Sequence, residues 1–287
     1  MRSFLKEITN RVLICDGAMG TMLYDRGIFV NRAFEELNLT RPELVELIHC
    51  AYLNAGADVI ETNTFGANRL KLHGFGLAEK LVELNIAGVD LARRVAGPKT
   101  YVAGAIGPLG VSILSDNRCS AADAEEYFHE QAEALQNGGV DLFILETFRS
   151  VEELLIAVRA IRVMSDLPIV AQLTITESGE SPDGIKPEIF SKQLDRAGAS
   201  VVGVNCGTGP APMLETVERL ERAINCPLAA QPNTGLPRQV EGRMMYMASP
   251  EYMASYARRF VKHGVKLVGG CCGTTPEHIR EIKAALN

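Results

Sequence analysis

Short runs of apolar and β-branched residues recur along the chain, and each run is followed by a segment with helical spacing. The runs are nearly continuous in apolar character, as strands that are covered on both faces must be. They therefore predict a parallel sheet. Eight such strands are expected, over Val12–Cys15, Asp58–Glu61, Tyr101–Ile106, Val140–Leu145, Pro168–Leu173, Ser200–Asn205, Pro227–Gln231 and Val265–Gly270.

The segments between these runs are amphipathic, and several end in glycine, as helices often do. Eight strand-and-helix units favour a single (β/α)₈ barrel, an α/β fold. The structural alternative is an open doubly wound sheet, which more often has about five or six strands. No linker, low-complexity tract or repeat separates a second domain, so residues 1–287 are expected to form one barrel domain. The longer connections 21–41 and 235–249 are predicted to be loops that cover a site.

Composition and charge narrow the class of protein. With 47% hydrophobic and 22% charged residues, the chain has ample material for a core, which excludes disordered and collagen-like proteins. The net charge of -6 offers no basic surface for phosphates, so no nucleic-acid partner is expected. Charged residues interrupt the amino-terminal stretch, so neither a secretory signal nor a membrane span is predicted, and a cytoplasmic location is expected.

Three of the seven cysteines are placed to meet. An odd number of cysteines without framework spacing, in a chain of this size, indicates thiols rather than disulfides. Catalytic groups of a parallel barrel lie at the carboxyl ends of its strands. Cys206 follows the sixth predicted strand, and Cys271 and Cys272 follow the eighth, so the three can converge across the seventh. The other four are interpreted as structural, without a converging partner: Cys15, Cys50, Cys119 and Cys226.

Converging thiolates favour a metal ion, and zinc is expected because soft sulfur ligands suit it. The chain lacks the two C-x₂₋₄-C pairs of a closed structural site, so an open fourth position is expected. Three thiolates over-neutralise Zn²⁺, which suits S-alkylation of a bound thiol better than hydrolysis. Two alternatives stay open, namely Cys206 as a small buried residue and Cys271 with Cys272 as a redox pair.

Other strand ends fit a small amino acid that carries a thiol. The turn DGAMGT, residues 16–21, can present backbone N–H groups to a carboxylate, and Asp16 or Glu146 could take an ammonium group. The glycines could equally serve the turn alone, and Glu61 and Glu146 could be structural carboxylates. An amide such as Asn233 more often stabilises a loop than it touches a substrate.

The motifs DGAMGT, ETNTFGAN, LETF, VNCGTG, QPNTG and GGCCGTTPEHI together resemble the homocysteine S-methyltransferases, over essentially the whole chain. The likeness extends to the homocysteine-binding modules of cobalamin-dependent methionine synthase and of enzymes fused to methylenetetrahydrofolate reductase. It implies that Cys206, Cys271 and Cys272 bind zinc and that the homocysteine sulfur completes the tetrahedron. By the same likeness, the backbone of Gly17, Ala18 and Met19 would hold the carboxylate, with Asp16, Glu146 and Asn233 near the amino group.

The resemblance also implies the reaction, which is methyl transfer to the bound thiolate to give methionine. The donor would be methylcobalamin or methyltetrahydrofolate, supplied through cobalamin- and folate-binding modules, because the chain has no D-x-H-x-x-G cobalamin signature. Alternatives are a free-standing enzyme that uses S-methylmethionine or S-adenosylmethionine, and a non-catalytic zinc module that binds thiols. Betaine is less favoured, since cages for quaternary ammonium are aromatic and the chain has no tryptophan.

Overall fold

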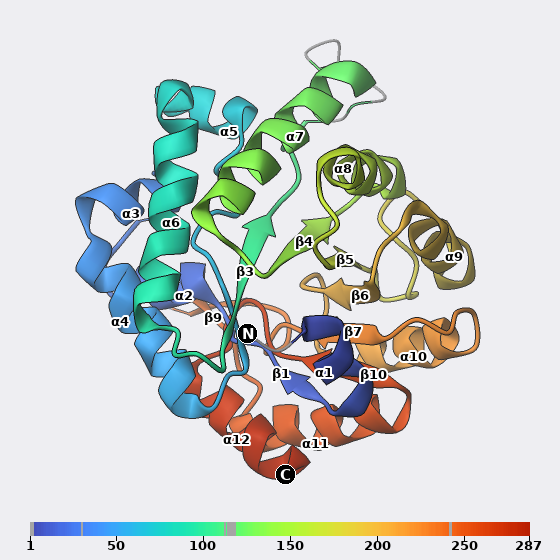
Figure 1. Ribbon diagram of the computed structural model, residues 1–287. Coiled ribbons are helices and arrows are strands. Elements are labelled where there is room, and N and C mark those ends of the chain that lie inside the picture. The colour runs from blue at the N-terminus through green and yellow to red at the C-terminus, as the bar shows by residue number, and fades with distance from the viewer. Residues whose placement is uncertain (1–2, 30, 112, 114–118, 241–242) are drawn as a thin grey trace.

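Eight parallel strands form one closed barrel (Figure 1). The computed structural model describes residues 3–29, 31–111, 113, 119–240 and 243–287. The strand order is β1-β10-β7-β6-β5-β4-β3-β2, and a parallel bridge between Cys15 and Val59 joins β1 to β2. The predicted (β/α)₈ fold is therefore confirmed. The strands are β1 (Leu13–Ile14), β2 (Val59–Glu61), β3 (Tyr101–Ile106), β4 (Leu142–Phe148), β5 (Ile169–Leu173), β6 (Val201–Asn205), β7 (Leu228–Gln231) and β10 (Val265–Val268).

Helices surround the barrel, at least one after each strand (Figure 1). Five of the main ones begin with proline in the first turn, where its missing N–H costs no hydrogen bond. Three end at a left-handed glycine, Gly56, Gly139 or Gly198. No described helix is long and apolar enough to cross a membrane. The main helices are α4 (Pro42–Ala55), α6 (Leu81–Val95), α7 (Ala121–Gly138), α8 (Val151–Met164), α9 (Pro187–Ala197), α10 (Pro210–Glu221), α11 (Pro250–Lys262) and α12 (Pro276–Leu286).

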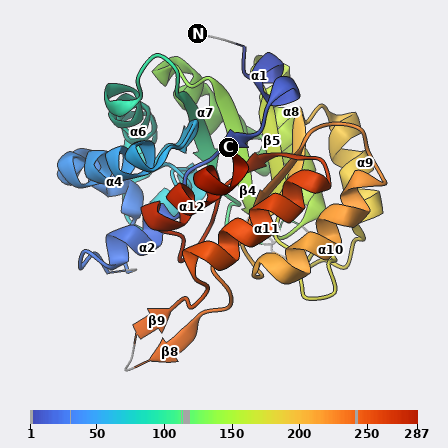
Figure 2. The same cartoon turned by 90° about the horizontal axis from the view of Figure 1, so that it is seen from below.

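The barrel interior is filled with side chains, and the short helix α1 (Phe4–Asn10) plugs one end of it. Phe4 and Ile8 are one helical turn apart and pack onto the inward-facing strand residues, with the Phe4 ring edge-on to Tyr101 at 5.4 Å between centroids. A helix of seven residues is not stable alone, so this burial holds it in place. The plug closes the end of the barrel opposite to the carboxyl ends of the strands (Figure 2).

The seam between β1 and β2 has the shortest strand pairing in the barrel wall. β1 has two residues and meets β2 through a single bridge. The side chain of Asp58, just before β2, reinforces this seam: its carboxylate accepts a hydrogen bond from the N–H of Ile14 over 3.0 Å. The same carboxylate pairs with Arg11 at 3.0 Å and with Lys283 of α12 at 3.1 Å.

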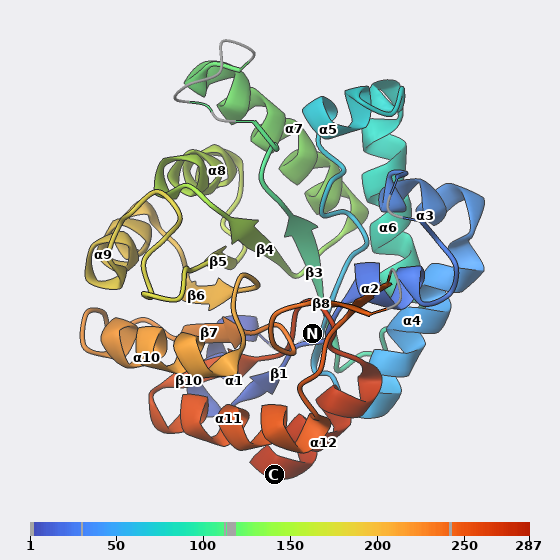
Figure 3. The same cartoon turned by 180° about the vertical axis from the view of Figure 1, so that it is seen from behind.

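The two long connections are more structured than expected. The segment 21–41, predicted to be a loop, contains most of α2 (Met19–Tyr24) together with η1 (Phe34–Glu36) and α3 (Leu37–Thr40). That prediction was wrong because helices of three to six residues are too short to show a periodic pattern. The segment 235–249 carries an antiparallel hairpin of β8 (Arg238–Val240) and β9 (Arg243–Met245). It projects from the carboxyl end of the barrel (Figures 2 and 3). The shorter helical segments after β2 are α5 (Arg69–His73) and η2 (Ala78–Lys80).

Candidate active site

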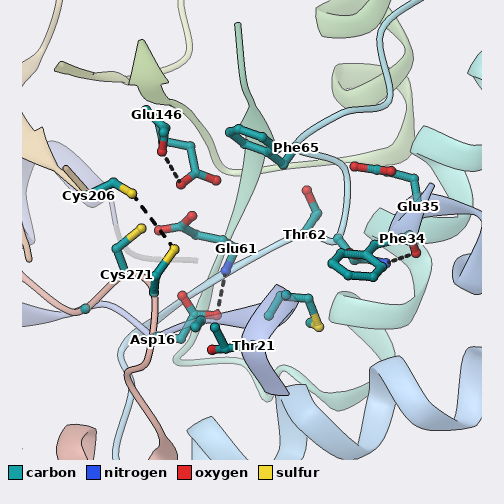
Figure 4. A pocket seen from close by; sticks show the side chains of 18 residues that line it. Asp16, Thr21, Phe34, Glu35, Glu61, Thr62, Phe65, Glu146, Cys206 and Cys271 are labelled. Atoms are coloured by element: carbon teal, nitrogen blue, oxygen red, sulfur yellow. Dashed lines mark hydrogen bonds between the residues drawn. The ribbon is translucent and has the colours of Figure 1, made fainter. Parts of the chain in front are cut away.

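A cavity of about 390 Å³ lies at the carboxyl ends of the strands (Figure 4). Its walls come from the residues that follow β1, β2, β6 and β10, from the end of β4, and from η1. Parallel barrels place their chemistry at this end, because the loops after all the strands meet there. Eight of the nine residues predicted for the site line the cavity: Asp16, Gly17, Ala18, Met19, Glu146, Cys206, Cys271 and Cys272.

Three cysteine sulfurs gather on one wall of the cavity. The Sγ atoms of Cys206 and Cys272 are 3.9 Å apart, and those of Cys206, Cys271 and Cys272 all lie within 4.8 Å of one another. Sulfur atoms around a tetrahedral zinc, with Zn–S bonds of about 2.3 Å, would be about 3.8 Å apart. The spacing of this cysteine cluster is therefore close to the spacing that a metal ion requires.

The protonation of the cysteine cluster also fits a cation. Hydrogen bonding among the three sulfurs lowers the pKa of Cys272 to about 3. The pKa of Cys271 is raised, because its hydrogen bonds to Cys206 and Cys272 hold its proton. The cluster alone thus favours one negative charge, and three thiolates together need a positive ion among them.

Cys206 reaches the cluster through an unusual backbone conformation. It follows the last residue of β6 and has φ of 55°, in the left-handed region, and Gly207 continues there with φ of 69°. Its N–H still donates to the carbonyl of Gln231 on β7, over 3.1 Å. The left-handed conformation of Cys206 lowers the stability of the fold by about 1 kcal/mol or more, and such strain is typical of functional sites.

The loop of Cys271 and Cys272 follows β10 and folds tightly on itself. A side chain at Gly270 would have its Cβ 2.2 Å from Oγ1 of Thr274, so only glycine fits at that position. The N–H of Cys271 donates to the carbonyl of Pro232 over 2.9 Å, and Thr274 closes the turn by donating its N–H to the carbonyl of Cys271. These contacts fix the two sulfurs relative to β7.

Carboxyl groups from three strands converge beside the cysteine cluster. Asp16 follows β1, Glu61 ends β2 and Glu146 lies in β4, and all three line the cavity. Burial raises the pKa of all three carboxyl groups, and repulsion from Glu61 raises the pKa of Asp16 and of Glu146 further. A ligand that brings positive charge would relieve both effects.

A β-bulge turns Glu146 into the cavity. The register of β4 against β5 shifts between Leu145 and Phe148, and Thr147 has φ of 63°. Asn205, at the end of β6, stabilises the bulge: its Oδ1 accepts from the N–H of Thr147 over 2.7 Å, and its Nδ2 donates to Glu146 over 3.3 Å. Bulges commonly re-aim side chains next to active sites.

The turn after β1 packs against the loop of Cys271 and Cys272. A Cβ at Gly17 would lie 2.9 Å from the Thr274 side chain, so glycine allows this close approach. The hydroxyl of Tyr52 lies 2.8 Å from the carbonyls of both Ala18 and Thr274 and joins the two loops. The N–H of Ala18 donates to Thr274 over 3.3 Å, so it is already engaged.

Comparison with known proteins decides the family. The profile of the homocysteine S-methyltransferases matches residues 13–286. The chain belongs to the homocysteine S-methyltransferase family. The resemblance expected from the motifs is thus confirmed.

The relatives of this member of the homocysteine S-methyltransferase family differ in length from one another. Methionine synthase of Mycobacterium leprae (strain TN) is 35% identical over 300 residues, which cover 98% of this chain and 25% of the relative. The chain therefore spans about a quarter of the length of such relatives. The crystal structure of the homocysteine methyltransferase MmuM from Escherichia coli is 25% identical; in its oxidized form the match covers 98% of both chains with a TM-score of 0.84. Its metallated form covers 96% of both chains with a TM-score of 0.82.

Asn233 lies outside the cavity lining, behind the cysteine loop. It is 4% exposed, and its Oδ1 accepts a hydrogen bond from the N–H of Cys272 over 3.1 Å. The structure therefore places this amide against the loop of Cys271 and Cys272 and not among the residues of the cavity wall.

Several residues that line the cavity escaped prediction. Phe34 and Glu35 come from η1, and Thr62 and Phe65 belong to the ETNTFGAN motif (Figure 4). The motif was a usable signal for Thr62 and Phe65, whereas no periodic pattern marks η1. Cys15 was also misjudged: its Sγ lies 3.3 Å from Oε1 of Glu61, so it does have a polar partner.

Proposed function

We propose that residues 1–287 form a homocysteine-binding barrel that holds zinc through Cys206, Cys271 and Cys272 and transfers a methyl group to homocysteine, giving methionine. The observation that carries this proposal is the cysteine cluster, with its sulfurs within 4.8 Å of one another on the wall of a cavity rich in carboxyl groups. Family membership supports the same reaction.

The donor set suits zinc and leaves access for a substrate. All three sulfurs come from residues that line the cavity, so a small thiol in the cavity can reach the same centre. When bound, zinc would keep a substrate thiol deprotonated at neutral pH, where a free thiol of pKa about 8.5 is mostly protonated.

The other residues of the cavity orient the amino acid part of the substrate. Asp16 and Glu146 supply negative charge for the ammonium group, and the backbone of the turn after β1 supplies N–H donors for the carboxylate. Because the N–H of Ala18 is engaged with Thr274, we assign the carboxylate first to the N–H groups of Gly17 and Met19. Asn233 does not contact the substrate but positions the cysteine loop, because its side chain accepts a hydrogen bond from the N–H of Cys272.

The reaction is an in-line displacement. The substrate sulfur forms a bond to the methyl carbon while the bond between that carbon and the donor breaks. The electron pair of the broken bond leaves with the donor. The chain contributes by holding the sulfur and the amino acid in one orientation, which converts an encounter into an intramolecular step.

We propose methylcobalamin, carried by a further module, as the donor, because the methionine synthase relatives are about four times longer than the matched region. The end-to-end match to MmuM supports a second candidate, a free-standing enzyme that uses a small donor such as S-methylmethionine or S-adenosylmethionine. Cytoplasmic location remains an expectation in either case.

The test combines metal content, coordination and donor use. We expect one zinc per chain by elemental analysis and a zinc X-ray absorption signal that gains a sulfur neighbour when homocysteine is added. Methionine formation is then assayed with methylcobalamin, S-methylmethionine and S-adenosylmethionine in turn. The zinc proposal would be refuted if metal-free protein formed methionine at the full rate. If the zinc-loaded protein bound homocysteine but used none of the three donors, the result would support a non-catalytic module that binds thiols.

A further inference from the structure

We infer that Glu61 is a further binding residue for the ammonium group of the substrate, and that Gln231 and Gln172 position its carboxylate. This inference rests on the proposed function and names the group that makes the site selective for amino thiols over simple thiols. The sequence alone left Glu61 open as a structural carboxylate.

Glu61 occupies the middle of the carboxyl cluster (Figure 4). It lines the cavity and is only partly buried, and it stands between Asp16 and Glu146. Its backbone N–H donates to Oδ2 of Asp16 over 3.0 Å, and its side chain lies beside that of Glu146 in the same cavity. An ammonium group that reached Asp16 and Glu146 would therefore also meet Glu61.

A chain of buried amides points its hydrogens at Glu61. Nε2 of Gln172 donates to Oε1 of Gln231 over 2.6 Å, and Nε2 of Gln231 donates to Oε1 of Glu61 over 2.7 Å. The Cys15 thiol donates to the same oxygen over 3.3 Å. Gln172 is fully buried, and its Oε1 has no hydrogen-bond partner. Gln231 thus turns its donor toward the carboxylate, and Gln172 holds it in that orientation, which stabilises a negative charge on Glu61.

The charge of the cavity calls for a cationic ligand group. Among the described residues that line it, four carry carboxyl groups and none is lysine, arginine or histidine. The other members of the cluster already share their oxygens: Asp16 accepts from the N–H of Glu61, and Glu146 accepts from Asn205 over 3.3 Å. The amino group of the substrate is the positive charge that balances this wall.

The test compares two ligands that differ only in the amino group. Homocysteine and 4-mercaptobutanoate share the thiol and the carboxylate, and calorimetric titration of the zinc-loaded protein gives a Kd for each. In Glu61→Gln we expect homocysteine to bind at least about 30-fold more weakly, as loss of one partner of a buried charge pair predicts. The Kd of 4-mercaptobutanoate should stay within about threefold, so the preference for the amino thiol shrinks.

Two further variants complete the test. Gln231→Met removes the donor to Glu61. It should lower the preference for homocysteine over 4-mercaptobutanoate by a smaller factor than Glu61→Gln does. A general loss of stability would weaken the binding of both ligands and leave their Kd ratio unchanged. Gln231→Met also decides the matter if Glu61→Gln does not fold. Glu153→Gln removes a buried carboxyl outside the cavity and should leave the ratio unchanged.

An unchanged Kd ratio in Glu61→Gln, or in Gln231→Met when only that variant folds, would overturn the inference while leaving the proposed function intact. Failure of the zinc-loaded wild type to bind either thiol would instead contradict the proposed function. Zinc content, measured for each variant, confirms that the metal site is equally filled.

Discussion

The N–H of Cys272 donates a hydrogen bond to the side-chain oxygen of Asn233, over 3.1 Å. This contact joins the loop after β10 to the loop after β7, and it holds the backbone of one cysteine of the cluster in place. Groups in this position fix the geometry of a metal ligand without touching the metal.

Asn233→Ala should therefore weaken zinc binding by about 10- to 100-fold, the usual effect of removing a supporting hydrogen bond. The measurement is competition against a zinc chelator. Asn85→Ala is the matched control, since Asn85 is also a buried amide but donates to Ala67 and Leu81, away from the cysteines. Both variants should lose about 1–3 kcal/mol of stability, and equal zinc affinities would argue against the role of Asn233.

Gly270→Ala should displace the loop of Cys271 and Cys272, because the added Cβ would lie 2.2 Å from Oγ1 of Thr274. We expect a loss of about 1–3 kcal/mol in the free energy of unfolding, together with reduced zinc content. Gly97→Ala serves as control, since nothing lies within 4 Å of a Cβ there. The interpretation of the loop fails if both variants retain zinc equally well.

Cys272→Ala should abolish zinc retention and methyl transfer while the barrel still folds, because residues beyond the strand ends contribute little to the core. Elemental analysis and circular dichroism measure the two effects separately. Cys50→Ala, in α4, should keep its zinc. A collapsed circular dichroism spectrum for Cys272→Ala would show that the metal site is needed for folding.

Stability should fall between about pH 6.5 and pH 4 because of His49. This side chain is fully buried in α4, neither ring nitrogen has a hydrogen-bond partner, and burial lowers its pKa from 6.5 to about 4. As the pH falls below 6.5, the unfolded state binds the proton first, because His49 stays neutral in the folded state until about pH 4. His49 therefore has no effect on the free energy of unfolding above pH 6.5, and it lowers this free energy by about 3 kcal/mol in all as the pH falls to 4.

Urea denaturation at several pH values measures this dependence. His49→Leu should show a shallower loss of stability over the same range, since the variant has no group to protonate in the unfolded chain. The difference between the two curves isolates His49 from the carboxyl groups, which titrate in both proteins. Parallel curves would contradict the assignment.

Much of the barrel follows from the sequence, because strands covered on both faces are continuously apolar and their ends are marked by polar residues. That rule located Cys206 beside Cys271 and Cys272 and placed Asp16 and Glu146 in the same cavity. Contacts that depend on the path of irregular segments were not accessible in the same way. The chain of amides from Gln172 through Gln231 to Glu61 joins three strands that are far apart in the sequence, and the position of η1 depends on tertiary packing that no local pattern encodes.

Asp58 joins α12 and the segment before β1 to one edge of the barrel, through its ion pairs with Lys283 and Arg11. Asp16 and Cys15 lie directly above this edge, where β1 and β2 share their single bridge. Loss of the two ion pairs of Asp58 would therefore loosen the wall of the barrel directly below Asp16. A surface charge on the outside of the barrel thus supports the strand that carries a carboxyl group of the cavity.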